Sequence, residues 1–205
     1  VAKALVDAGA AWLGVSNLEE AIQLRRAGLT QPVLILSYTP PAEAARLAEY
    51  DVTQTVISGD YARRLSLAAT AAGVTLRVHI KLDTGMSRVG FVYAQPERDA
   101  STLDELEAAC RLPHLCAEGI FTHFASADEE DDGYTRQQYA CFTDAIERLA
   151  ARGITFAWRH CCNSAATLRH PEMHLDMVRP GIILYGLTPS EWMQPYLERL
   201  GLKPV

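Results

Sequence analysis

The apolar residues of this chain switch repeatedly between short runs typical of β-strands and longer stretches with helical periodicity. Strands that alternate with helices in this way predict βαβ units and a parallel sheet. The strand-like runs are AWLGVS (from Ala11), VLIL, TQTVI, VTLRVHIKL (ending at Leu82), CAEGIFT (ending at Thr122), TFAWRH and MVRPGIILY.

Local signals place the helices between these runs. Asn17 is a suitable N-cap for a helix that ends at Gly28, with acidic residues in its first turn, where the helix dipole favours them. Pro40 and Pro41 begin another helix, since proline is tolerated in a first turn. Further helices are expected over 59–72, 101–111, 134–152 and the short SAATLRH segment, and the opening VAKALVDAGA reads as the interior of a helix.

Seven expected strands without a second domain favour an incomplete (β/α)8 TIM-type barrel, in which the first strand is missing. Such barrels need about 250 residues, and this chain has 205. We therefore expect residues 1–205 to be a partial barrel domain, a fragment of a longer protein. A doubly wound open sheet is the alternative, and the strand pattern alone does not separate the two.

Composition narrows the class of protein. The chain is 49% hydrophobic, as expected for a globular domain, and its net charge of −6 argues against a nucleic-acid binder. No apolar run approaches the roughly 18 residues of a membrane span. Five cysteines, two of them adjacent (Cys161 and Cys162), favour reduced thiols in the cytoplasm, in a soluble protein or the cytoplasmic part of an anchored one.

No metal site is expected. The chain has no CxxC pair, and Pro171 separates His170 from His174. The acidic run over 127–132 lacks the spaced ligands of a calcium loop and is expected to be a solvated loop.

Polar residues gather where the expected strands end, which is where barrel enzymes carry their chemistry. Each has a structural explanation when taken singly, but the clusters fall after consecutive strands. The segments NSAA and PGI follow the last two strands, where backbone N–H groups of barrels often hold phosphate. The residues concerned are Lys81, Asp83, Arg88, His123, His160, Asn163, Ser164, Arg179 and Gly181.

Four segments together resemble the alanine racemase family, in the right order and at plausible spacing. They are HIKLDTGMSRVGF (79–91), GIFTHFASAD (119–128), HCCNSAA (160–166) and DMVRPGIILYG (176–186). The resemblance covers nearly the whole chain, and it implies pyridoxal 5'-phosphate as the cofactor.

The resemblance also implies a role for each matching residue. His123 would pack against the cofactor's pyridine ring, while Arg179 would point at the ring nitrogen with His160 supporting it. Arg88 would reach the phenolic oxygen and the substrate carboxylate, oriented by a carbamylated Lys81. The phosphate would be held by Ser164, Gly181 and Ile182, with Asn163 close by.

Arg179 favours one reaction type over others. Most enzymes of this cofactor place a carboxylate at the ring nitrogen, which keeps that nitrogen protonated and makes the ring a strong electron sink. An arginine side chain cannot supply a proton so readily, because its pKa lies above about 12. Brief removal and return of a proton, as in racemisation, suits such a site better than transamination or decarboxylation.

Two expected features of the family are absent from the sequence. The Schiff-base lysine lies on the family's first strand in a motif like KANAYGHG, whereas the lysines here are Lys3, Lys81 and Lys203. The second base is a tyrosine from the C-terminal β domain of the partner subunit. We therefore expect the chain by itself to be inactive.

The expected function is interconversion of L- and D-alanine, with serine as another candidate substrate, in a homodimer that supplies D-amino acid for peptidoglycan. A fold-related decarboxylase of basic amino acids and a non-catalytic cofactor-binding barrel are the alternatives.

Overall fold

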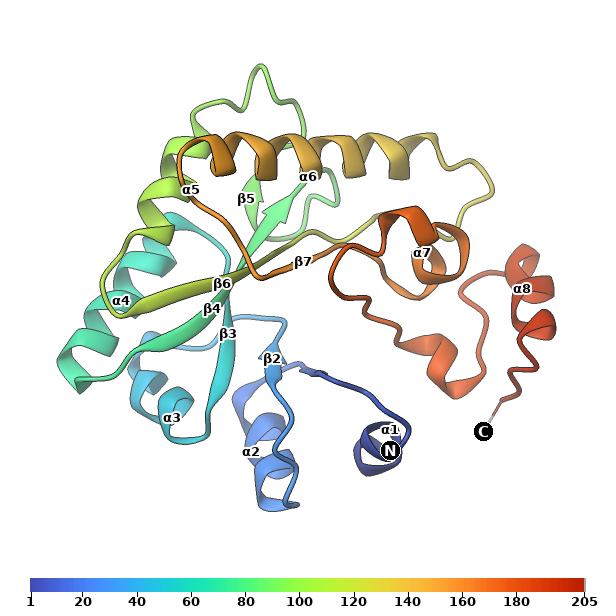
Figure 1. Ribbon diagram of the computed structural model, residues 1–205, viewed down its shortest axis with the longest axis horizontal. Helices are drawn as coiled ribbons and strands as arrows, with labels where there is room; N and C mark the ends of the chain where they lie inside the picture. Colours follow the sequence, from blue (N-terminus) through green and yellow to red (C-terminus); the bar gives the residue numbers. More distant parts are fainter. Residues whose placement is uncertain (205) are drawn as a thin grey trace. The chain divides into compact units, whose positions relative to one another are not determined.

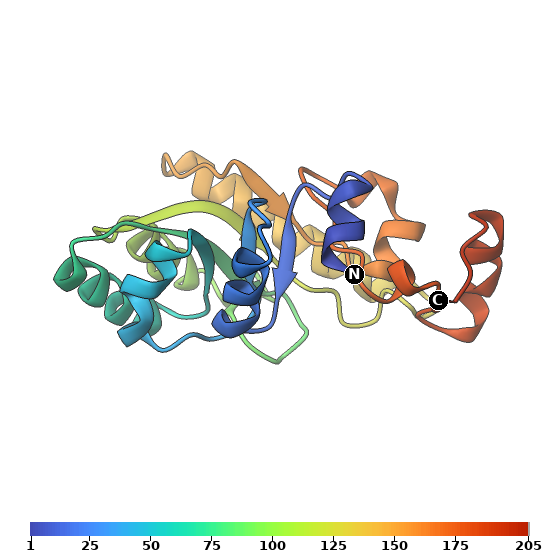
Figure 2. The same ribbon diagram turned by 90° about the horizontal axis from the view of Figure 1, so that it is seen from below.

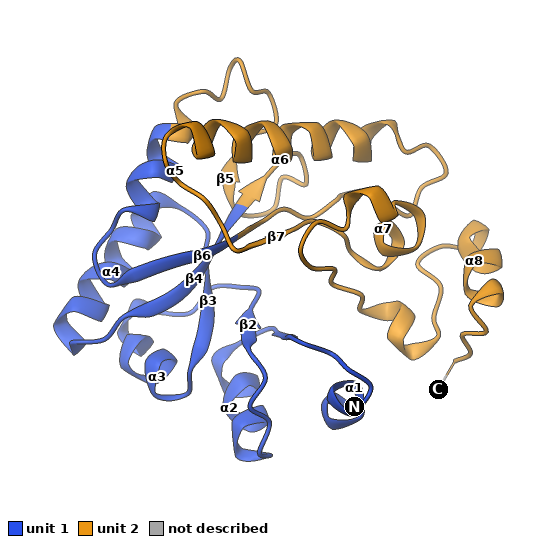
Figure 3. Ribbon diagram, viewed as in Figure 1, with its two compact units in different colours: residues 1–81, 104–119 blue, residues 82–103, 120–205 orange. Residues whose placement is uncertain are grey.

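A computed structural model describes residues 1–204 and divides them into two compact units (Figure 3). Unit 1 comprises residues 1–81 and 104–119, and unit 2 comprises residues 82–103 and 120–205, of which 205 lies outside the described residues. The strands β4 and β6 pass from unit 1 into unit 2 along the chain.

The strands are paired in chain order, β1-β2-β3-β4-β6-β7, and β5 pairs with β4 in addition (Figure 1). A doubly wound sheet reverses its strand order at a switch point, whereas a (β/α)8 barrel keeps chain order. The structure therefore confirms part of a (β/α)8 barrel. The strands are β1 (Leu13–Val15), β2 (Val33–Ile35), β3 (Val52–Val56), β4 (Leu76–Asp83), β5 (Phe91–Val92), β6 (Leu115–Phe121) and β7 (Trp158–His160).

Unit 1 repeats a strand followed by a helix. Its strands are in parallel register, with Leu13 beside Val33, Val33 beside Val52 and Gln54 beside Val78. The helix α2 packs on β1 and β2, and α3 and α4 pack on β3. Figure 2 gives a second view of the chain. The helices are α1 (Ala2–Asp7), α2 (Leu18–Arg26), η1 (Pro41–Glu43), α3 (Ala44–Glu49), α4 (Gly59–Ala72) and α5 (Thr102–Cys110), the last beginning in unit 2.

The expected cap Asn17 acts as predicted in unit 1. The side chain of Asn17 accepts a hydrogen bond from the backbone N–H of Glu20 at 3.0 Å. Helix α4 spans the predicted residues, with Ser58 as its N-cap and Gly73 in the left-handed region at its end. Pro41 begins a 3-10 turn, η1, and α3 starts only at Ala44, so the helix expected from Pro40 begins later than predicted.

Unit 2 contains a long helix, α6 (Gly133–Ala151), and several short ones. The core residues Phe124, Phe142 and Leu149 are fully buried, the last two on α6. The short helices are α7 (Ser164–Arg169), η2 (Pro171–Met173), η3 (Ile182–Tyr185), η4 (Glu191–Met193) and α8 (Gln194–Arg199). None of the helices over residues 1–204 is both long and apolar enough to cross a membrane.

The prediction of a strand over MVRPGIILY is wrong, because no strand forms there. Backbone bonds from Asp176 to Arg159 and from Arg179 to Cys162 hold this segment beside β7. Pro180 then removes a donor, Gly181 leaves the extended region (φ −126, ψ −85), and η3 follows. The strand β5 was not expected from the sequence, and neither was α8.

Candidate functional site

Arg179 is the centre of the site in unit 2. One terminal nitrogen donates to Nδ1 of His160 at 2.6 Å, and the other donates to the carbonyls of Thr122 at 2.8 Å and Cys161 at 3.3 Å. These acceptors follow or end β6 and β7, so two strand ends fix the guanidinium. These bonds use three of its five N–H groups. The Nε–H, which makes no hydrogen bond with the rest of the described chain, is one of the two left for a ligand.

The contact with His160 also fixes the state of that ring. A guanidinium can only donate hydrogen bonds, so Nδ1 of His160 carries no proton and accepts. The ring is fully buried and stacks on Phe121, with centroids 4.8 Å apart and planes 6° apart. The Cζ atom of Arg179 lies 5.1 Å from the centroid of the Phe121 ring, so the guanidinium and this ring also make a cation–π contact.

Burial alters the electrostatics of Arg179. It lowers the pKa of Arg179 to about 10, and the neighbouring Cys161 and Cys162 oppose that shift. A pKa of about 10 is below the value assumed from sequence, but it still leaves the guanidinium charged at neutral pH. Arg179 therefore remains a donor and a fixed positive charge.

The segments NSAA and PGI do meet, as expected from their places after neighbouring strands. The backbone N–H of Gly181 donates to Oγ of Ser164 at 2.8 Å. The Ser164 hydroxyl therefore keeps its own proton for an acceptor, and no such acceptor is found within residues 1–204. Asn163 caps α7 through its side chain, which accepts from the N–H of Ala166 at 3.0 Å, and Ile182 begins η3 with an exposed side chain.

The loop after β4 is organised by Asp83. Its carboxylate is buried and accepts backbone N–H groups from Gly85, Ser87 and Arg88 at 3.0, 2.9 and 3.0 Å. Ser87 has a positive φ of 57°, which a non-glycine residue adopts only when it is held there. The loop therefore presents residues 84–88 in a fixed conformation.

The remaining expected site residues lie near strand ends but are not all brought together. Lys81 is buried in β4, and Arg88 is exposed, its side chain making no hydrogen bond or ion pair with the described residues. His123 is half-buried two residues after the end of β6. The ring of Phe121 and the carbonyls of Thr122 and Cys161 were not expected at this site. The two carbonyls were missed because a backbone acceptor leaves no signature in a sequence.

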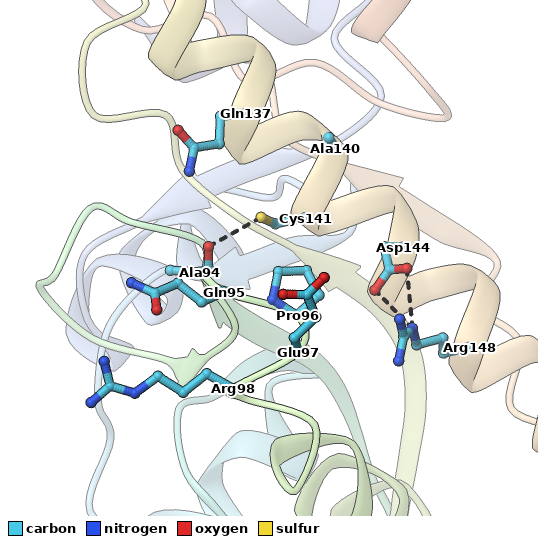
Figure 4. A pocket seen from close by; sticks show the side chains of 10 residues that line it. All are labelled: Ala94, Gln95, Pro96, Glu97, Arg98, Gln137, Ala140, Cys141, Asp144 and Arg148. Atoms are coloured by element: carbon cyan, nitrogen blue, oxygen red, sulfur yellow. Dashed lines mark hydrogen bonds and ion pairs between the residues drawn. The ribbon is translucent and has the colours of Figure 1, made fainter.

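A separate hollow of about 620 Å³ lies in unit 2 between residues 94–98 and α6 (Figure 4). It contains none of the expected site residues. Asp144 pairs with Arg148, and the Cys141 thiol donates to the carbonyl of Ala94 at 3.3 Å. These groups are satisfied within the chain, so we assign the hollow no ligand.

All five cysteines are free, and Cys161 and Cys162 are fully buried, as expected for packing residues. No cluster of three or more histidine, cysteine or acidic side chains with the geometry of a metal site occurs in residues 1–204. The acidic run is a loop as predicted: carbonyls of Ala127 and Glu130 accept from Arg169, while the side chains of Glu129 to Asp131 are exposed.

The strand order is that of part of a (β/α)8-barrel domain, and an arginine is fixed between two of its strand ends. The chain belongs to the family described as "Alanine racemase, N-terminal domain", whose model matches residues 1–189.

Curated relatives and solved structures agree with this assignment. An alanine racemase of Desulforamulus reducens is 49% identical over 191 residues, covering 93% of this chain and 50% of the relative. One of Desulfovibrio desulfuricans is 50% identical over 186 residues, covering 91% and 48%. The chain thus spans about half the length of the curated relatives it matches.

Two solved structures match the whole chain. An alanine racemase of Clostridium difficile in complex with cycloserine has a TM-score of 0.90 at 37% identity, with 54% of that chain covered. The alanine racemase of Bacillus anthracis with bound L-Ala-P has a TM-score of 0.87 at 38% identity, with 51% covered.

Proposed function

We propose that residues 1–205 are the cofactor-binding barrel part of a pyridoxal-phosphate-dependent alanine racemase, a cytoplasmic homodimer that interconverts L- and D-alanine for peptidoglycan. The observation that carries the proposal is the guanidinium of Arg179, fixed by His160, Thr122 and Cys161. Family membership supports the alanine substrate, and the five free cysteines support a reducing compartment.

The residues present fit the cofactor at two points. Its ring nitrogen needs a donor, and the Nε–H of Arg179 makes no hydrogen bond within the described part of the chain. Its phosphate needs donors as well, and the Ser164 hydroxyl has a proton to give beside the Gly181 backbone. Asn163 and Ile182 would contribute from the start of α7 and of η3.

When bound, pyridoxal phosphate supplies the electron sink that lets the α-proton of an amino acid leave and return. The chain's own residues then set how strong that sink is. Arg179 stays charged at neutral pH, and it would donate to the ring nitrogen without giving up a proton, so that nitrogen would remain neutral. His123 packs on the ring in this proposal, and Arg88 holds the substrate carboxylate with help from Lys81.

A direct assay tests the reaction type. The complete racemase, purified with pyridoxal phosphate, should convert L-alanine to D-alanine, measured by chiral chromatography. L-Serine and L-ornithine are run in parallel. Release of CO₂ from ornithine would favour the decarboxylase instead, and cofactor binding without turnover of any substrate would favour the non-catalytic barrel.

The 205-residue chain alone should not hold pyridoxal phosphate through a lysine. Lys3 is exposed on α1, Lys81 is buried in β4 and Lys203 follows α8, and none lies in the family's lysine motif. Borohydride reduction followed by peptide mapping should therefore find no stoichiometric lysine adduct. A stoichiometric adduct on Lys3 or Lys203 would contradict the prediction that the chain is a partial barrel without the Schiff-base lysine. An adduct on Lys81 would also contradict the role proposed for Lys81.

Lys81 should act through Arg88 and not as a base. An N-carboxylated lysine carries a negative charge and can accept the bidentate hydrogen bonds of a guanidinium. Lys81→Ala should lower racemase activity, and small added carboxylates should restore part of it. Lys3→Ala is the matched control, because that side chain is exposed and should not respond. Wild-type activity in Lys81→Ala would rule the role out.

A further inference from the structure

The amide of Gln138 ties three parts of unit 2 together. Gln138 lies on α6 and is fully buried. Its Oε1 accepts the backbone N–H of Ala125 at 2.8 Å, and its Nε2 donates to the carbonyl of His123 at 3.3 Å and to Oγ1 of Thr84 at 3.4 Å. One side chain thus holds the loop after β6 from both sides of Phe124.

The network continues to the arginine. Oγ1 of Thr84 is 2.8 Å from Oγ1 of Thr122, and both threonines are buried. The carbonyl of Thr122 accepts from Arg179 at 2.8 Å. Gln138 therefore fixes the backbone of His123. Through the hydroxyls of Thr84 and Thr122 it also fixes Thr122, whose carbonyl holds Arg179.

The amide of Gln138 does more than fill space in the core. An apolar residue of similar volume would leave the N–H of Ala125 and the carbonyl of His123 without this partner, which is unfavourable for polar groups removed from water. The neighbouring helix positions Phe142 and Ala145 are buried and apolar. What Gln138 provides and an apolar residue cannot is a fixed direction for the backbone of residues 122–125.

We propose that Gln138 is a positioning residue for the racemase site, setting the places of His123 and Arg179 without touching substrate or cofactor. The inference rests on the proposed function. A misplacement of about 1 Å in a reacting group can cost on the order of a hundredfold in rate. Gln138 holds in place, indirectly, two residues that would contact the cofactor ring, so removal of its amide should lower turnover by about tenfold or more.

The test compares Gln138→Met with Tyr134→Phe in the complete racemase. Methionine keeps the length of the side chain and removes its three hydrogen bonds. Tyr134→Phe removes another bond from α6 to the loop after β4, since the Tyr134 hydroxyl donates to the carbonyl of Gly85 at 2.8 Å. Gln138→Met should lower kcat about tenfold or more with KM for alanine little changed. The induced circular dichroism of the bound cofactor should also change. Tyr134→Phe should leave kcat and the circular dichroism unchanged, and any effect of loosening the loop that carries Arg88 should be confined to KM.

Two further measurements keep the proposal falsifiable. Hydrogen exchange in the protein freed of cofactor should speed up at the Ala125 amide in Gln138→Met and not in Tyr134→Phe. Thr84→Val, which breaks only the link between Gln138 and Thr122, should lower kcat severalfold, and it decides the question if Gln138→Met fails to fold.

Normal kcat and normal circular dichroism in a folded Gln138→Met, or in Thr84→Val if the methionine variant does not fold, would overturn the positioning role, even with a lowered melting temperature. A wild-type protein that does not racemise alanine would instead overturn the proposed function, and the positioning role with it.

Discussion

Arg179→Glu should slow alanine racemisation by about a hundredfold or more in the complete racemase, the usual loss when a preorganised electrostatic group is removed. A carboxylate at the ring nitrogen would keep it protonated and strengthen the electron sink. Side transamination should therefore rise relative to racemisation, and an assay for pyruvate measures it beside the rate with D- and L-alanine.

The structure indicates that Arg179→Glu should also destabilise the fold. Arg179 satisfies three acceptors, Nδ1 of His160 and the carbonyls of Thr122 and Cys161. A glutamate would put a negative charge among them, so the melting temperature should fall as well. Arg179→Lys keeps the positive charge, but a lysine cannot reach all three acceptors in the same geometry. Comparing the two variants therefore separates the effect of losing the charge from the effect of losing the three hydrogen bonds.

His160→Ala is the milder companion variant, because it frees one nitrogen of the guanidinium and leaves two carbonyl contacts. It should slow racemisation less than Arg179→Glu does. If Arg179→Glu racemises alanine at the wild-type rate, Arg179 does not face the ring nitrogen, and the proposed arrangement of the site is wrong.

Asp83→Ala should lower the free energy of unfolding by about 2–4 kcal/mol, because three backbone N–H groups lose a charged acceptor. Ser87 would also lose the bond that holds its positive φ. Urea unfolding of the complete protein measures the change. The freed loop carries Arg88, so KM for alanine should rise as well.

Asp60→Ala is the matched control. Asp60 is an exposed acidic residue on α4 with only long contacts to Arg63 and Arg64, at 4.0 and 3.8 Å. Its removal should cost less than about 1 kcal/mol. An equal effect of the two substitutions would show that Asp83 does not organise the loop.

Hydrophobic periodicity and caps determined most of the local structure. The run from Gly59 to Ala72 predicted α4 to the residue, and Asn17 predicted the start of α2, because helix period and N-cap chemistry are local properties. The strand MVRPGIILY failed for the opposite reason. Apolar β-branched residues favour a strand, but a strand also needs a partner along its length, and after Arg179 this segment turns into η3.

The sequence by itself determined the alternation of strands and helices, the family resemblance, and the residues that lie at strand ends. Only the tertiary structure decided between barrel and doubly wound order, because strand neighbours are set by long-range pairing. It also decided what holds the site. The anchors of Arg179 include two backbone carbonyls, and the partners of Gln138 include the backbone of His123 and Ala125. Every residue has these backbone groups, so only folding selects which of them meet.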